Sequence, residues 1–219
     1  MECIYCHYSR TYQLSDGLCK CPRCKRKYSP QKQARELAIL MDFLHGHSSL
    51  QAAKIHQCHY LTVHRLYMKF RGLIAKYSDE MYAANEHLVT EYDESLYIPH
   101  RLRKSTQNIT KAHNFLTFSF EDKVYNIMMP HLGRYSETLD SKSIKQFLRF
   151  HKIAKLSKAS NTITAFWDFF ETFIAKYRGV SADSFVYYLK EGEFRFNYTY
   201  EEQKEILLSL VRKHCSDLS

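Results

Sequence analysis

The sequence predicts a mixed α+β protein, and three changes of pattern along its 219 residues carry that prediction. Residues 1–30 are rich in cysteine and turns, residues 31–82 carry apolar residues at helical spacing, and residues 83–219 open with strand-like alternation before helical patterns return. These three segments are the predicted domains. With 45% apolar residues and few Gly or Pro, a chain of this length can bury a core.

Positive charge concentrates in the first part of the chain. Residues 1–80 hold 13 Lys and Arg against 6 Asp and Glu, a net +7 of the total +9. Such a field attracts polyanions, so it favours nucleic acid over an anionic membrane surface as the partner. The other interpretation is a surface that only keeps the protein soluble. The chain lacks a signal-peptide pattern and an apolar run of about 20 residues, which predicts a cytoplasmic protein without a membrane partner.

Two C-x-x-C pairs, Cys3-x-x-Cys6 and Cys21-x-x-Cys24, stand 14 residues apart in the first segment. Each pair turns tightly enough to aim two thiolates at one ion, so together they predict a zinc ribbon with a closed, tetrahedral four-sulfur site. A closed site makes the zinc structural. Its binding would stabilise a segment too small to fold by apolar burial alone.

Two neighbours of this quartet are alternative ligands, and cations surround its second pair. Cys19 could replace Cys21, although the C-x-x-C geometry favours Cys21, and His7 is a weaker substitute. Cations held on a rigid turn can contact DNA phosphates without reading sequence, or they form only a solvated basic turn. These cations are Lys20, Arg23, Lys25, Arg26 and Lys27.

The second segment predicts one helix followed by a helix-turn-helix. A short helix capped by Ser48 leads through a turn at residues 57–59 into a longer helix at residues 60–77. The preceding helix has an apolar face made of Leu37, Leu40, Met41 and Leu44.

The longer helix divides its residues as a DNA recognition helix does. In that arrangement early outward residues meet base edges in the major groove and later cations meet phosphate, so we expect sequence-specific binding of double-stranded DNA. The outward residues are Tyr60, Thr62, His64, Arg65 and Lys69. The residues expected in the core are Leu61, Leu66, Phe70, Leu73 and Ile74.

The third segment predicts strands and then helices. Alternation at residues 87–99 predicts a strand, and two runs at 114–120 and 124–129, on either side of Glu121-Asp122, predict a hairpin. Helices are expected further on, at residues 144–155, 162–177 and 201–213. The second of these has an apolar stripe made of Ile163, Phe166, Trp167, Phe170, Phe173 and Ile174.

Three motifs in this segment resemble those of zinc-ribbon DDE transposases of bacterial insertion sequences. Residues 91–98, E-Y-D-E-S-L-Y-I, resemble the family's V-D-E-T-Y-I strand, and residues 161–167, N-T-I-T-A-F-W, resemble its N-G-I-E-N-F-W helix start. Residues 188–197, Y-L-K-E-G-E-F-R-F-N, resemble its Y-L-x-E-x-x-F-R-x-N signature. With ribbon and helix-turn-helix in the same order, the resemblance covers nearly the whole chain. It implies a reduced ribonuclease-H-like α/β core and a DNA-bound homo-oligomer, such as a dimer, at the bacterial nucleoid.

Transposases of this kind cut and join DNA with two Mg²⁺ ions held by three acidic residues, because the attacking and leaving oxygens each need a cation. Asp93 matches the first acid, Glu137 matches the second loosely, and Thr164 stands where the third acid, a Glu, belongs. A neutral hydroxyl cannot replace a carboxylate as a Mg²⁺ ligand. Asp168, one helical turn after Thr164, could substitute only if the helix slid by a turn.

The resemblance therefore implies a transposase-type DNA-binding protein that has lost its catalysis. Two alternatives stay open. The first is an active cut-and-paste transposase that uses Asp93, Glu137 and Asp168 with two Mg²⁺ ions. The second is a zinc-ribbon protein that binds RNA or another protein.

Overall fold

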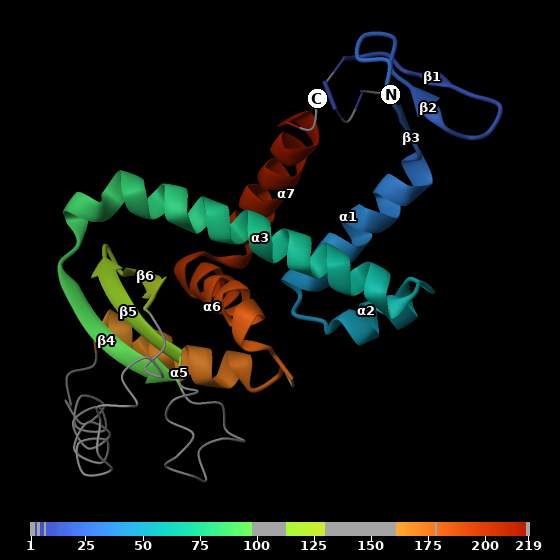
Figure 1. Ribbon diagram of the computed structural model, residues 1–219. Coiled ribbons are helices and arrows are strands. Elements are labelled where there is room, and N and C mark those ends of the chain that lie inside the picture. Colours follow the sequence, from blue (N-terminus) through green and yellow to red (C-terminus); the bar gives the residue numbers. More distant parts are fainter. Residues whose placement is uncertain are drawn as a thin grey trace. The chain divides into compact units, whose positions relative to one another are not determined.

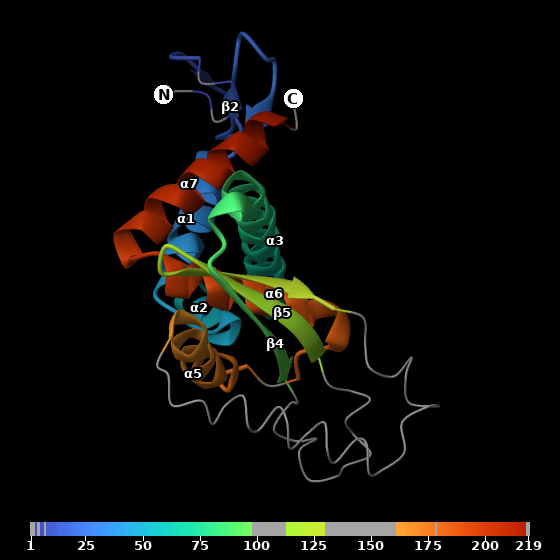
Figure 2. The ribbon, with the colours of Figure 1, turned by 90° about the vertical axis from the view of Figure 1, so that its left-hand side faces the viewer.

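The computed structural model describes residues 3, 5–6, 8–97, 113–129, 161–177 and 179–217 (Figures 1 and 2). These residues form six α-helices and two three-stranded antiparallel sheets, so the predicted mixed α+β class is confirmed. The chain divides into two compact units. Unit 1 is Met1–Lys76 with Tyr198–Ser219, and unit 2 is Tyr77–Asn197. The last helix therefore belongs to unit 1, although the sequence placed it in the third segment.

Unit 1 begins with a small sheet of three two-residue strands: β1 (Tyr12–Gln13), β2 (Cys19–Lys20) and β3 (Lys27–Tyr28). The central strand β2 pairs with both neighbours. Gly17 has a φ of 78° in the turn between β1 and β2, a backbone conformation that glycine adopts at little cost. Tyr28 is buried and meets the ring of Tyr5 edge-on, with 6.2 Å between the ring centroids.

Unit 1 continues with helices α1 (Pro30–Leu44) and α2 (Ser49–Ile55), the first part of α3 (Tyr60–Asn85), and α7 (Tyr200–Asp217). The predicted cap of α2 is confirmed, because the Ser48 and Gln51 side chains bond each other's backbone N–H in a capping box. Gln57, with a φ of 50°, turns the chain between α2 and α3. None of the described helices is both long and apolar enough to cross a membrane.

Two leucines expected in the core of unit 1 are exposed instead. Leu37 on α1 is 39% exposed and Leu61 on α3 is 49% exposed. The buried residues of α3 form a stripe that begins at Val63 and continues at intervals of four, three and four residues. Leu61 therefore lies on the other side of the helix. The stripe is Val63, Tyr67, Phe70 and Ile74, and α1 buries Ile39, Leu40, Phe43 and Leu44.

Unit 2 is built on a sheet of β4 (Glu91–Tyr97), β5 (His113–Phe120) and β6 (Lys123–Met128) in sequence order. The predicted hairpin is confirmed. Glu121 and Asp122 form its two-residue turn with φ values of 47° and 62°, as a type I′ turn requires. The predicted strand at residues 87–99 begins later, at Glu91, because a 3₁₀ turn (η1, Glu86–Leu88) comes first.

Helices α5 (Thr162–Ile174) and α6 (Ala182–Asn197) cover one face of this sheet, as Figure 2 shows. Phe115 of β5 stacks on Trp167 of α5, and His113 of β5 stacks on Phe185 of α6. The predicted apolar stripe of the 162–177 helix is buried except for Trp167, which is half-buried. Helix α6 was not predicted from periodicity, and the helix expected at residues 144–155 lies outside the described residues.

The two helices approach each other closely at Gly192. A Cβ atom at this position would lie 2.6 Å from Cδ2 of Phe170, closer than non-bonded carbon atoms can approach. Glycine at this point therefore lets the buried Phe170 ring lie against the α6 backbone. Gly192 is the glycine of the Y-L-K-E-G-E-F-R-F-N motif at residues 188–197.

Candidate metal centre and candidate nucleic-acid interface

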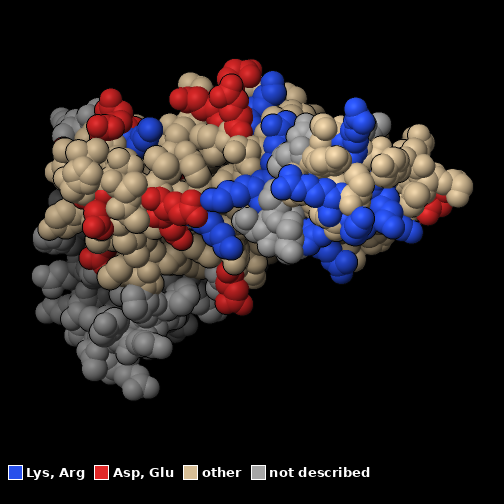
Figure 3. All heavy atoms as spheres, turned by 90° about the horizontal axis from the view of Figure 1, so that it is seen from above, with Lys and Arg blue, Asp and Glu red and all other residues tan. Residues whose placement is uncertain are grey.

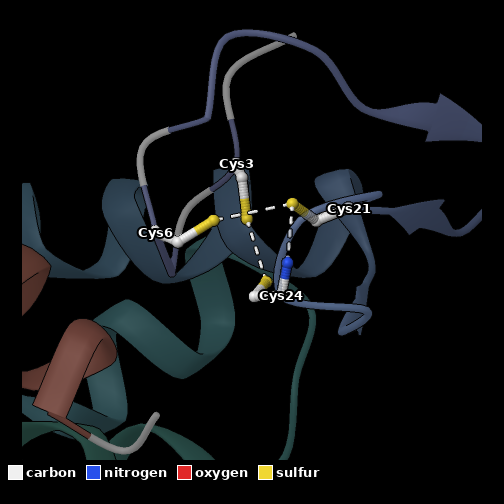
Figure 4. A group of neighbouring side chains, drawn as sticks. All are labelled: Cys3, Cys6, Cys21 and Cys24. Atoms are coloured by element: carbon white, nitrogen blue, oxygen red, sulfur yellow. Dashed lines mark hydrogen bonds between the residues drawn. The ribbon is translucent and has the colours of Figure 1, made fainter.

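The four predicted zinc ligands converge in unit 1 (Figure 4). The sulfur atoms of Cys3, Cys6, Cys21 and Cys24 all lie within 4.8 Å of one another. The Sγ atoms of Cys3 and Cys24 are 3.7 Å apart and those of Cys6 and Cys21 are 3.5 Å apart. Four sulfurs at about 2.3 Å from a tetrahedral zinc ion stand about 3.8 Å from each other, so the cluster is compatible with a structural zinc site. Within the described residues, no second set of three or more such ligand atoms converges.

Tight turns aim these sulfurs. The backbone N–H of Cys24 donates to Sγ of Cys21 at 3.5 Å, and the N–H of Cys21 donates to the carbonyl of Arg26 at 3.0 Å. Lys25, between them, has a φ of 62°, in the left-handed region. The N–H of Cys3 closes the first turn on the carbonyl of Tyr8 at 2.8 Å. These turns direct the four sulfurs toward one point.

The thiols of the cluster differ in acidity. Burial raises the pKa of Cys3 to about 12. Burial acts in the same direction on Cys21, but hydrogen bonds from the backbone N–H groups of Cys24 and Arg23 outweigh it and lower the pKa of Cys21 to about 6. A zinc ion binds thiolates, so its binding displaces protons from groups such as Cys3.

The alternative ligands have different positions. Cys19 is buried in β2 opposite Tyr28 and is not among the four converging sulfurs. The structure therefore places Cys21, rather than Cys19, in the cluster. His7 lies outside the described residues.

The five predicted phosphate-contacting cations surround the second cysteine pair. Arg23, Lys25 and Lys27 are exposed, and Lys20 faces Lys27 across the β2–β3 ladder. Arg26 is half-buried, with its guanidinium 4.9 Å from the centroid of the Tyr5 ring. Figure 3 shows Lys and Arg side chains gathered over this end of unit 1.

The first turns of α3 hold the predicted base-contacting residues. Tyr60 is 42% exposed and stacks on His64 with 5.6 Å between ring centroids. Thr62 and Arg65 are exposed and Lys69 is half-buried. Arg65 and Lys69 have no ion pair within the part of the chain that the structure describes, and neither has Lys76 further along the helix. The side of α3 opposite its buried stripe is therefore cationic.

One carboxylate that sequence reasoning missed fixes the chain around α2. Asp42 of α1 bonds two imidazoles: its Oδ1 lies 2.9 Å from Nδ1 of His47, and its Oδ2 lies 2.6 Å from Nε2 of His56. His47 precedes α2 and His56 ends it. Asp42 thus holds both ends of α2 to α1. No sequence spacing marks such a contact, because the three residues come from different elements.

The predicted acidic residues of the core are only partly described. Asp93 lies in β4 opposite Thr117 of β5, half-buried, on the sheet face that α5 and α6 cover. Asp168 on α5 is exposed. Glu137 lies outside the described residues. Asp93 and Asp168 belong to no group of three or more converging metal ligands within the described residues.

Thr164, at the third acid's position, serves the start of α5. Its Oγ1 accepts the N–H of Asn161 at 3.0 Å and donates to the carbonyl of Asn161 at 2.9 Å. Oδ1 of Asn161 in turn accepts the N–H of Thr164 at 2.8 Å, which completes a capping box. The amide of Asn161 also donates to Glu91 of β4 at 3.3 Å. The hydroxyl is engaged in holding the helix start beside the strand that carries Asp93.

The motif at residues 188–197 forms a buried polar contact between α6 and the sheet. Both carboxylate oxygens of Glu193 accept from Nζ of Lys190, and one of them accepts the backbone N–H and the side-chain amide of Asn126. The Asn197 amide bonds both the N–H and the carbonyl of Val124 on β6. Burial lowers the pKa of Lys190 and raises that of Glu193, because each charge loses its hydration. These motif residues hold α6 against the sheet.

No family model matches the chain, and no curated protein and no solved structure matches it.

Proposed function

We propose that this protein binds double-stranded DNA sequence-specifically through α3, that a structural zinc ion stabilises its N-terminal segment, and that its transposase-type core does not cleave DNA. One observation carries the proposal. The side of α3 opposite its buried stripe presents Arg65, Lys69 and Lys76, and the described residues give none of them an acidic partner. Cations without ion pairs on one helix face suit a polyanion.

The arrangement of helices supports the same proposal. The short helix α2 and the longer α3 follow one another through a tight turn, as in a helix-turn-helix, whose second helix enters the major groove with its early residues against the bases. Asp42 bonds the histidines at both ends of α2 and so holds this helix, which precedes α3, to α1. Cations of the ribbon would add phosphate contacts, which position the protein without reading sequence.

The zinc ion fits the quartet by chemistry and by distance. Four thiols in a closed cluster are the donor set of structural zinc sites. Since the strands described before α1 are each two residues long, zinc binding would supply much of the folding free energy of this segment. We propose that the metal holds the ribbon's cations in place and takes no part in a reaction.

The core supports a transposase-type ancestry in one respect and its inactivity in another. Asp93 stands on β4, at the strand position that the resemblance gives to the first acid, although the described sheet is antiparallel and the resemblance implies a mixed one. Thr164 replaces the third acid, and its hydroxyl is engaged with Asn161. Two Mg²⁺ ions need three carboxylates, and with Thr164 at the third position Asp93 would have at most one acidic partner.

Binding to random-sequence duplex DNA, followed by selection of a preferred site, tests the proposal. We expect the full-length zinc-loaded protein to select a site, and Arg65→Ala to weaken binding to it about tenfold or more and to relax preference at one position. Lys176→Ala, which removes one exposed cation from unit 2, is the matched control and should leave affinity unchanged. Equal binding by Arg65→Ala and the parent protein would point to another surface or another partner, such as RNA or a protein.

Incubation of the selected DNA with Mg²⁺ or Mn²⁺ tests the loss of catalysis. We expect intact strands. Strand cleavage that disappears in Asp93→Ala would establish an active enzyme instead, with Asp93, Glu137 and Asp168 as its candidate acids.

A further inference from the structure

Leu61 occupies an unusual place for a leucine. It lies in the second position of α3 and is 49% exposed. At about 100° per residue, Leu61 lies about 160° from Val63 around the helix axis in one direction, and Arg65 lies about 160° from it in the other. Both side chains therefore point away from the buried stripe. A single exposed leucine is ordinary on a protein surface. The residues around Leu61 on this face of the helix indicate what it could contact.

Those neighbours are polar and aromatic. Residues four apart on a helix stand side by side, with about 5–6 Å between their Cβ atoms, so Leu61 lies next to Arg65. Tyr60 is restrained by its stacking on His64, and Thr62 is exposed. One branched apolar side chain is thus set beside a cation that has no acidic partner in the described residues.

Resting on the proposed function, we infer that Leu61 reads the C5-methyl group of a thymine within two base pairs of a guanine read by Arg65. In the major groove, the thymine methyl is the one apolar group that a base edge presents, while guanine offers the two acceptors that Arg prefers. Successive base pairs rise by about 3.4 Å, so side chains about 5–6 Å apart reach bases one or two steps apart. The charge of this helix face selects DNA as the occupant over a second protein surface.

Thymine-to-deoxyuridine replacement in the selected duplex tests this inference, because it removes the methyl group and keeps the base pair. With the full-length zinc-loaded protein, replacement at one thymine near the guanine of Arg65 should weaken binding about fourfold, the value of one buried methyl group. Leu61→Ala should bind thymine and deoxyuridine equally at that position. Leu61→Met, which keeps an apolar side chain, should retain part of the difference.

Leu50→Ala is the control, since it removes a leucine that is 55% exposed on α2 and should leave the thymine preference intact. A selected site that tolerates deoxyuridine at every thymine, or a thymine preference that persists in Leu61→Ala, overturns the inference and leaves the proposed function standing. Failure of the parent protein to bind any duplex overturns both.

Discussion

At the scale of single residues, the cysteines show how far spacing alone can predict a site. Two C-x-x-C pairs specified Cys3, Cys6, Cys21 and Cys24, and the structure brings these four sulfurs together. Spacing left Cys19 open as a substitute, because it lies two residues from Cys21. The fold separates the two, since Cys19 is buried in β2 opposite Tyr28, whereas Cys21 follows the strand in the turn that carries the second cysteine pair.

Replacement of single cysteines tests this assignment. Cys21→Ser should reduce the zinc content of the purified protein from about one ion per chain to well below one. Cys19→Ser should retain about one ion per chain, because Cys19 is not in the cluster. Metal analysis of the two proteins measures the difference, and equal zinc content in both would remove Cys21 from the ligand set.

Glu193 could not be recognised as structural from sequence. A motif rich in Lys, Glu and Arg predicts an exposed segment, yet Lys190, Glu191 and Glu193 are buried. Their burial depends on partners distant in sequence, such as Asn126. Periodicity also missed α6 for this reason, because charged residues occupy its inward face.

Glu193→Ala should lower the free energy of unfolding by about 3–5 kcal/mol, because it removes the nearer and buried carboxylate of the Lys190 ammonium and leaves the exposed Asp79 carboxylate at 3.8 Å. Glu193→Gln should cost less, since its amide oxygen can still accept the N–H of Asn126. Glu201→Ala, which removes a carboxylate whose side chain is 73% exposed, is the control and should change stability by less than about 0.5 kcal/mol. Urea unfolding measures all three, and similar losses for Glu193→Ala and Glu201→Ala would contradict this assignment.

At the scale of elements, the sequence predicted those features that depend on residues close to one another in the chain. The Ser48 cap, the Glu121-Asp122 hairpin and the apolar stripe of α5 were all predicted. The exact buried stripe of α3 was not, because several leucines fit helical spacing and tertiary packing chooses among them. Leu61, which fits helical spacing, is exposed for that reason.

Two glycines on different helices give a matched test of element packing. Gly192→Ala should destabilise unit 2 by about 1–3 kcal/mol, because the new methyl group would meet Phe170 at 2.6 Å. Gly72→Ala on α3, where nothing lies within 4 Å, should stabilise the protein by up to about 1 kcal/mol through helix propensity. Thermal unfolding of the two variants should therefore shift in opposite directions. Unchanged or raised stability of Gly192→Ala would mean that α5 and α6 do not meet at Gly192.

At the scale of the whole molecule, charge separates the two units. Unit 1, residues 1–76 with 198–219, carries 16 Lys and Arg against 8 Asp and Glu, whereas unit 2, residues 77–197, carries 16 against 15. Composition predicted this division, but the membership of α7 in unit 1 depends on contacts between distant segments, such as the hydrogen bond of Tyr200 to His45. We propose that unit 1 binds DNA, through the outward side of α3.

A photo-crosslink from α3 to DNA tests that assignment most directly. A photoreactive benzoylphenylalanine at the position of Thr62, in the full-length zinc-loaded protein, should crosslink to bases inside the selected duplex site. The same group at the position of Lys176, which lies in unit 2, should give no crosslink within that site. Crosslinking from position 176 but not from position 62, or from neither, would contradict the account.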